Sequence, residues 1–223
     1  MIKINDPVTI FANAPTCNNH CFPVIEYTQT YVLPTNDDCV LAVIPVKDYS
    51  NPDDFFNKVF GKSTSYKFRK VAEDGYICRP VDVDERNARL DELYTINTST
   101  DERQGGKMNE TYCQYPEKWE KTDCPHHFIK TYGAFAPDGT WIGYIDVVFA
   151  GEWTNTKHLL GHKQYLNECK RGSFMVNLWF CLVKDIMENH SHINYIQYHL
   201  MGVGNPGLDE WKKRVGLREA LII

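Results

Sequence analysis

Residues 128–149 read FIKTYGAFAPDGTWIGYIDVVF, two apolar stretches joined by Pro137, Asp138 and Gly139. Aspartate followed by glycine supplies the positive-φ geometry of a tight hairpin turn. The first stretch therefore predicts a strand over residues 128–135, and the second predicts its antiparallel partner over residues 140–149. This β-hairpin is the best-defined part of the chain.

A long apolar helix is predicted after the hairpin. Residues 152–172 have mixed polarity and are interpreted as a loop, and Ser173 then caps a helix that extends to about residue 189. This helix is apolar nearly all round, which predicts that it is buried on most sides inside the domain. The chain continues with a strand (193–201), a glycine-rich turn (202–207), a short helix (208–215) closed by Gly216, and a last strand (217–223).

Helices and short strands alternate before the hairpin. Strands are predicted over residues 8–12, 24–32, 39–46 and 76–83, and a glycine-bearing loop over residues 98–108. Asn51 caps a helix with Pro52 at its first position, and a second helix runs from about Ser63 to Gly75. Asp84 caps a third helix with an amphipathic stripe of Leu90, Leu93, Tyr94 and Asn97.

Composition places the chain among ordinary globular proteins. It has 223 residues, of which 43% are hydrophobic and 24% charged, and its formal net charge is −5. This acidic balance argues against a role in coating nucleic acid, although a local basic groove remains compatible with it. Without a secretory signal, the eight cysteines indicate free thiols. We therefore expect a cytoplasmic protein that does not enter a membrane.

The order of elements resembles the GNAT-type N-acyltransferase superfamily. GVGNPGLDEWKKRVG at residues 202–216 is similar to the C-terminal signature of that superfamily. SYKFRKVAEDG at residues 65–75 is similar to the basic helix of its FemAB-like branch. The resemblance covers about residues 55–223. It implies an α+β fold with a mixed, mostly antiparallel sheet flanked by helices, in one domain that spans residues 1–223. Residues 1–50 either join that domain or form an added subdomain.

The resemblance also implies a donor site. In GNAT proteins acyl-CoA lies where two adjacent strands splay apart, and a glycine-rich turn holds its pyrophosphate. That turn is absent here, because residues 157–162 read KHLLGH and residues 170–173 read KRGS. Acyl-CoA remains a candidate donor, and so does aminoacyl-tRNA, which FemAB-like enzymes use. The expected donor-binding residues are Lys157, Lys170, Arg171, Gly172 and Ser173.

Acyl transfer to an amine needs a proton acceptor, for which the sequence offers three candidates. They are Asp146, Glu152 and His162, and His162 is favoured because its imidazole titrates near neutral pH. The resemblance places Tyr198 where a phenol could protonate the leaving group. Arg103, Gln104 and Lys107 are expected to bind substrate from a loop with two glycines, and Arg103 and Gln104 to line the cleft of residues 152–162.

Metal binding has weaker support. Cys113, Cys124, His126 and His127 are zinc-ligand types at a spacing that fits no standard finger, and His158 and His162 lack a third ligand. We expect no metal.

Three functions remain open. The first is an N-acyl or aminoacyl transferase that acts on an amine, which could be a small molecule. The second is a nucleic-acid-directed version that modifies a base or uses tRNA, with tRNA or DNA as partner. The third is a GNAT-shaped binding module without catalysis.

Overall fold

The computed structural model describes residues 1–4, 40–103, 106–169, 173–203 and 206–222. In this part of the chain eight strands form one sheet in the order β1-β10-β2-β9-β8-β7-β6-β3. Only β1 with β10 and β8 with β9 pair in parallel among the described strands, so the sheet is mixed and mostly antiparallel as predicted. The strands are β1 (Ile2–Ile4), β2 (Leu41–Pro45), β3 (Ile77–Val81), β6 (His127–Phe135), β7 (Trp141–Ala150), β8 (Trp153–Gly161), β9 (Tyr195–Leu200) and β10 (Arg218–Ile222).

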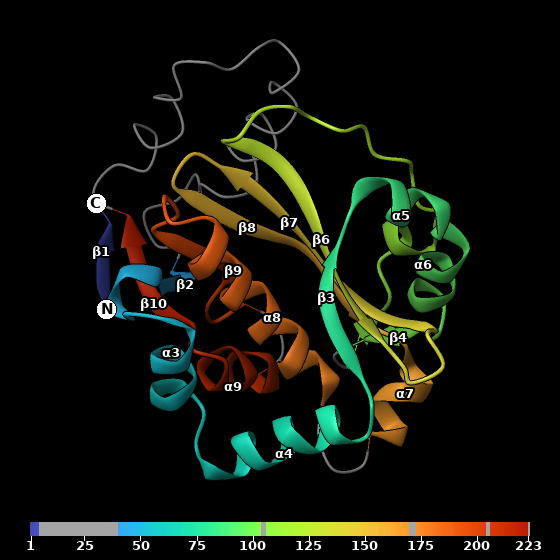
Figure 1. Ribbon diagram of the computed structural model, residues 1–223, viewed down its shortest axis with the longest axis horizontal. Helices are drawn as coiled ribbons and strands as arrows, with labels where there is room; N and C mark the ends of the chain where they lie inside the picture. The colour runs from blue at the N-terminus through green and yellow to red at the C-terminus, as the bar shows by residue number, and fades with distance from the viewer. Residues whose placement is uncertain (5–39, 104–105, 170–172, 204–205, 223) are drawn as a thin grey trace.

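Helices flank this sheet on both faces (Figure 1). The α-helices are α3 (Pro52–Val59), α4 (Lys62–Glu73), α5 (Val83–Ala88), α6 (Leu90–Asn97), α7 (Lys163–Glu168), α8 (Phe174–Asn189) and α9 (Pro206–Arg214). A second sheet pairs two short strands, β4 (Glu102–Arg103) and β5 (Gly106–Lys107). Two short 3-10 helices, η2 (Val46–Asp48) and η3 (Glu110–Cys113), complete the described elements. The fold class is therefore α+β, with a mixed sheet flanked by helices, as the resemblance implies.

The hairpin and the helix after it are confirmed. β6 and β7 pair in antiparallel register from His127 opposite Ala150 to Phe135 opposite Trp141. α8 begins directly after Ser173, and ten of its sixteen residues are buried. Leu178, Trp179 and Leu182 in α8 are among the residues that pack into the main core beside the inner face of the sheet. The apolar character of this helix is explained by that position.

Two sequence predictions are wrong. Residues 152–172 were expected to form a loop, but they contain β8 and α7. Thr154, Asn155 and Thr156 made this segment look exposed, yet all three are buried within the sheet. The single helix expected from Asp84 is two helices, and Asp82 caps the first by accepting a hydrogen bond from the Glu85 amide at 2.8 Å. The strands expected at 8–12 and 24–32 lie outside the described residues, whereas β1 and β2, from the same N-terminal region, belong to the main sheet.

Two glycines let α8 approach the sheet closely. A Cβ built on Gly143 of β7 would lie 2.6 Å from Phe174 Cε2, and one on Gly161 of β8 would lie 3.0 Å from Phe174 Cζ. The Phe174 ring therefore occupies the space that side chains at these two positions would fill. This contact holds the first turn of α8 against the ends of β7 and β8.

A buried carboxylate ties α8 to β6. Asp185 Oδ2 accepts hydrogen bonds from Lys130 Nζ at 2.6 Å and from Tyr132 Oη at 2.7 Å, and Oδ1 accepts one from Asn189 at 2.9 Å. Burial opposes ionisation of Asp185, but the hydrogen bonds from His190, Lys130 and Tyr132 outweigh it and hold the pKa of Asp185 below its usual range. The carboxylate is therefore ionised and stabilising near neutral pH.

We predict that Asp185→Asn lowers the free energy of unfolding by about 3 kcal/mol at pH 7, because it leaves the Lys130 ammonium without its counter-ion. A group whose pKa is depressed by folding stabilises above its unfolded pKa and loses that contribution on acidification. The difference in free energy of unfolding between wild type and variant should therefore become smaller below about pH 4. Urea denaturation at several pH values measures it. Glu188→Gln, on the exposed side of α8, is the control. An equal gap at pH 7 and pH 3 would contradict the ion pair.

Candidate functional site

β8 and β9 diverge after a short stretch of pairing. Their parallel register runs from Trp153 opposite Tyr195 to Asn155 opposite Gln197 and then ends, although β8 continues to Gly161 and β9 to Leu200. At the paired end, Trp153 Nε1 donates a hydrogen bond of 2.8 Å to Gln197 Oε1. The two strands are thus joined at one end and open at the other.

Irregularities in both strands accompany the divergence. On β8, Asp146 pairs with His158 and Val147 with Thr156, so Lys157 is the extra residue of a β-bulge. On β9, the pairing with β2 also shifts, and His199 has a φ of 57°. A bulge bends its strand, and a non-glycine residue in the left-handed region is strained and common at functional sites. Both strands therefore turn away from each other where their pairing stops.

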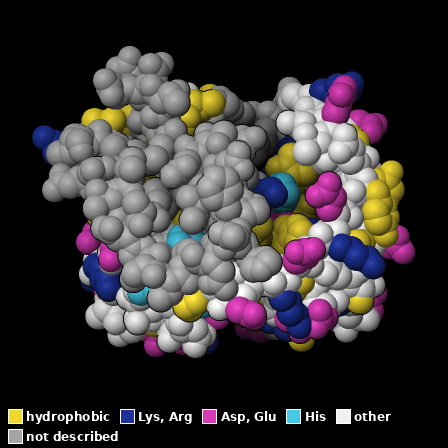
Figure 2. All heavy atoms as spheres, turned by 90° about the horizontal axis from the view of Figure 1, so that it is seen from above, with side chains coloured by type: hydrophobic (Ala, Val, Ile, Leu, Met, Phe, Trp, Pro, Cys, Tyr) yellow, Lys and Arg dark blue, Asp and Glu magenta, His cyan; other side chains and the backbone are white. Residues whose placement is uncertain are grey.

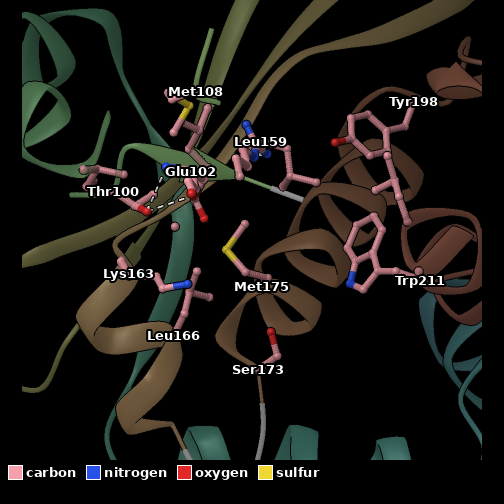
Figure 3. Close-up of a pocket in the computed structure, with 16 residues that line it drawn as sticks. Thr100, Glu102, Met108, Leu159, Lys163, Leu166, Ser173, Met175, Tyr198 and Trp211 are labelled. Carbon is pink, nitrogen blue, oxygen red and sulfur yellow. Dashed lines mark hydrogen bonds between the residues drawn. The ribbon is translucent and has the colours of Figure 1, made fainter. Parts of the chain in front are cut away.

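A cavity of about 430 Å³ lies at the open end. Leu159, Leu160 and Gly161 of β8 line it from one strand, and Tyr198 lines it from the other. Figure 3 shows Met175 of α8 between these walls, with Thr100, Glu102 and Met108 on one side and Tyr198 and Trp211 on the other. Both strands, α8 and the segment around β4 therefore all contribute residues to the wall of the cavity.

Two polar side chains of this cavity have defined partners. Arg103 donates a hydrogen bond to the carbonyl oxygen of Leu159, a residue beyond the last β8–β9 pair. The Arg103 guanidinium also lies 5.8 Å from the centre of the Tyr112 ring. The Tyr198 hydroxyl points towards the middle of the cavity (Figure 3). Burial raises the pKa of Tyr198, with Arg103 opposing the change, so this phenol remains protonated near neutral pH.

A second, polar hollow of about 510 Å³ lies beside the start of α8. Ser173 lines both this hollow and the cavity between the strands. Lys67 of α4 and Arg214 of α9 line it as well, and neither forms an ion pair with another described residue. Free cations next to a helix N-terminus suit an anionic group.

Figure 2 shows another face of the molecule, with a hollow in which hydrophobic, cationic and histidine side chains are visible.

The structure separates the three predicted proton acceptors. Glu152 is exposed at the start of β8 and bonds Asn194, about 25 Å along the strand from the cavity. His162 precedes α7 with its ring 5.4 Å from that of Tyr165, and burial lowers the pKa of His162. Asp146 is fully buried and hydrogen-bonded to Thr131 and His158. Their catalytic roles remain predictions.

The predicted binding residues fall in different places. Arg103 and Ser173 line the cavity, and the expected proximity of Arg103 to part of the 152–162 segment is observed. Lys157 is the bulge residue of β8, and Lys107 is exposed on β5. Gln104, Lys170, Arg171 and Gly172 lie outside the described residues.

Sequence reasoning missed the pair of Asp146 and His158. Asp146 Oδ2 and His158 Nδ1 are 2.9 Å apart across β7 and β8. In a segment interpreted as a loop, His158 is a candidate metal ligand only, and its pairing with Asp146 is not visible. The signal that could have indicated a strand here is the β-branched Thr154 and Thr156 between the apolar Trp153 and Leu159, although it does not give the register with Asp146.

Metal-ligating side chains do not cluster within the described ranges. These residues contain no group of three or more histidine, cysteine or acidic side chains placed to hold a metal ion. Cys124 Sγ lies 3.6 Å from His127 Nδ1, and these two side chains do not belong to a group of three among the described residues. None of the described helices is both long and apolar enough to cross a membrane.

Comparison with known proteins supports the fold. No protein-family model matches the sequence. No curated protein matches it either. Among solved structures, FemX is 9% identical with a TM-score of 0.53, and the alignment covers 84% of this chain and 61% of FemX. L-PGS from Bacillus licheniformis is 9% identical with a TM-score of 0.48, and the alignment covers 81% of this chain and 57% of that chain. A tandem GNAT protein from the clavulanic acid biosynthesis pathway is 10% identical with a TM-score of 0.47, at 94% and 58% coverage.

This chain thus spans less than two thirds of the length of these proteins. The similarity to FemX, together with the strand order and the divergent strands, defines a GNAT-like fold.

We predict that Arg103→Ala lowers the melting temperature by about 2–8 °C, because it removes a charged hydrogen bond worth about 1–2 kcal/mol. The melting temperature of Arg103→Lys should lie between those of the wild type and Arg103→Ala, since lysine keeps the positive charge but lacks the planar guanidinium. Lys107→Ala, on the exposed partner strand of the same small hairpin, should change the melting temperature by less than about 1 °C. Differential scanning calorimetry measures all three. An unchanged midpoint for Arg103→Ala would show that Arg103 does not hold the Leu159 carbonyl in solution.

Proposed function

We propose that this protein is an N-acyltransferase or aminoacyltransferase, which moves an acyl group from a thioester or aminoacyl donor to an amine. The observation that carries the proposal is the cavity between the diverging strands, lined by Leu159, Leu160 and Gly161 on β8 and by Tyr198 on β9. Polar backbone groups of β8 that lack a partner on β9 border an apolar space there. Such an arrangement can hold an acyl chain and stabilise a developing oxyanion.

The donor's anionic part would lie beside the start of α8. Ser173 connects the cavity to the polar hollow where Lys67 and Arg214 are free to bind phosphate oxygens. These residues fit the phosphates of CoA and equally those of an RNA 3′ end. Acyl-CoA, when bound, supplies a thioester carbonyl as the electrophile. The chain's own residues supply binding, orientation and proton transfer.

The proposed role of Tyr198 is to assist the leaving group. Its hydroxyl points into the cavity, and because burial raises its pKa it carries a proton that a departing sulfur or oxygen could take as negative charge develops there. The acceptor would enter on the side of Arg103 and Glu102, which line the opposite wall. Arg103 bonds the Leu159 carbonyl and so helps to set the shape of the strand that the donor contacts.

A nucleic-acid-linked donor is the second candidate. α4 presents Lys62, Lys67 and Arg69 on its exposed surface, together with Tyr66, whose exposed fraction is 50%. Cations with an exposed aromatic ring suit a phosphate backbone and an unpaired base. This feature and the FemAB-like resemblance favour aminoacyl-tRNA over CoA, whereas the overall negative charge argues the other way.

We predict that Leu208→Trp weakens donor binding at least about tenfold. Leu208 lines the cavity and is only half-buried, so the larger indole side chain would fill part of the space that the donor needs. Ile77→Trp is the matched control, since Ile77 is 58% exposed on the edge strand β3. Isothermal titration with acetyl-CoA and, separately, with phenylalanyl-tRNA measures binding to the wild type and both variants. The probe that binds identifies the donor class. Equal affinities for the two variants, or no binding of either probe to the wild type, would contradict the proposed function.

A further inference from the structure

Asp146 is held in a fixed orientation beneath His158. Its side chain is fully buried, and each carboxylate oxygen has its own donor: Oδ1 accepts from Thr131 Oγ1 at 2.7 Å, and Oδ2 lies 2.9 Å from His158 Nδ1. An ionised carboxylate can only accept hydrogen bonds. The proton of a neutral His158 therefore lies on Nδ1, and Nε2 carries the free lone pair.

The bulge at Lys157 brings His158 to this position. Because one extra residue stands between Thr156 and His158, the imidazole lies on the same face of the sheet as Asp146, which it pairs with across the strands. His158 is also beyond Asn155, the last β8 residue paired with β9, and directly precedes Leu159 in the cavity wall. The imidazole thus lies on the part of β8 that is not paired with β9, on the same face of the sheet as Asp146.

Its surroundings leave Nε2 accessible. The His158 side chain is 24% exposed, and none of the described residues bonds its Nε2. The centre of the Tyr112 ring lies 5.4 Å from that of the imidazole, and the guanidinium of Arg103, which lines the cavity, lies 5.8 Å from the centre of the same Tyr112 ring. The charged and titratable groups that face the pair are Tyr144 of β7, Tyr112 of η3, Arg103 of β4 and the buried Arg86 of α5, which interacts electrostatically with Asp146.

We propose that His158 is the proton acceptor for the amine substrate and that Asp146 is its positioning residue. This inference rests on the proposed acyltransferase function. The amine nitrogen forms a C–N bond with the donor carbonyl carbon and gives one proton to His158 Nε2. The C–S or C–O bond breaks, and the leaving atom keeps the electron pair and takes a proton from Tyr198 Oη. Solvent then carries the proton from the imidazolium to the Tyr198 phenolate.

Asp146 is less suited than His158 to accept that proton directly. Both of its oxygens are occupied, and it has no contact with solvent. The buried carboxylate instead stabilises the imidazolium that forms when His158 is protonated.

The decisive experiment is chemical rescue of His158→Ala. With acetyl-CoA or phenylalanyl-tRNA as donor probe and ethanolamine as amine probe, turnover should fall about 10²–10⁴-fold, while donor affinity stays within about twofold. Added imidazole should restore part of the activity, and the acidic limb of the pH–rate profile should be lost without it. His126→Ala, at the opposite end of the hairpin, is the matched control and should neither lose activity nor respond to imidazole.

Failure of this inference differs from failure of the proposed function. A wild type that binds neither donor refutes both, whereas donor binding with near-normal turnover in His158→Ala refutes only the role of His158. Loss of turnover that imidazole does not restore also refutes it. Nitrogen-15 NMR of the ring needs no donor: the proton should be on Nδ1 in the wild type and on Nε2 in Asp146→Asn, where the amide donates to Nδ1. A wild-type proton on Nε2 would overturn the proposal.

Discussion

The contact of Phe174 with Gly143 and Gly161 is the constraint on which the candidate site depends. Any side chain at either glycine would push the first turn of α8 away from β7 and β8. With the ring seated there, Ser173 reaches the junction of the cavity and the polar hollow, and Met175 lies inside the cavity. The long apolar helix therefore does more than fill the core. It places its own N-terminus beside the end of β8, where a donor's anionic part and acyl part would meet.

Bending of the two central strands then creates the space. β8 stays paired with β7 and β9 stays paired with β2, so neither strand loses its place in the sheet when they part. The bulge at Lys157 has two consequences: it bends β8 away from β9, and it sets His158 opposite Asp146. One local irregularity thus links the divergence that opens the cavity to the position of the proposed proton acceptor, one residue before the cavity wall at Leu159. Arg103 stabilises the separated strand by bonding the Leu159 carbonyl.

The sequence predicted the hairpin and α8 because their patterns are strong: an Asp-Gly turn between apolar stretches, and a sixteen-residue apolar helix after Ser173. It did not predict β8, because buried threonine and asparagine side chains resemble loop composition when their burial is unknown. The residues of the candidate site also divide into those that the sequence indicated and those that it did not. Tyr198, Arg103 and Ser173 were named from the sequence and line the cavity, whereas the Asp146–His158 pair depends on the register of an unrecognised strand and on a bulge. No local pattern encodes such a register.

Backbone hydrogen exchange tests the central claim that the donor binds between β8 and β9. The pairing of β8 with β9 ends at Asn155, so a donor in the cavity should cover the amides of β8 beyond that residue. With acetyl-CoA or phenylalanyl-tRNA at saturation, we expect slower exchange in residues 157–161 and 198–201 and at the start of α8, and little change in β3 or β10. Saturating binding of a donor that slows exchange elsewhere, while residues 157–161 and 198–201 exchange as in the free protein, would contradict the account.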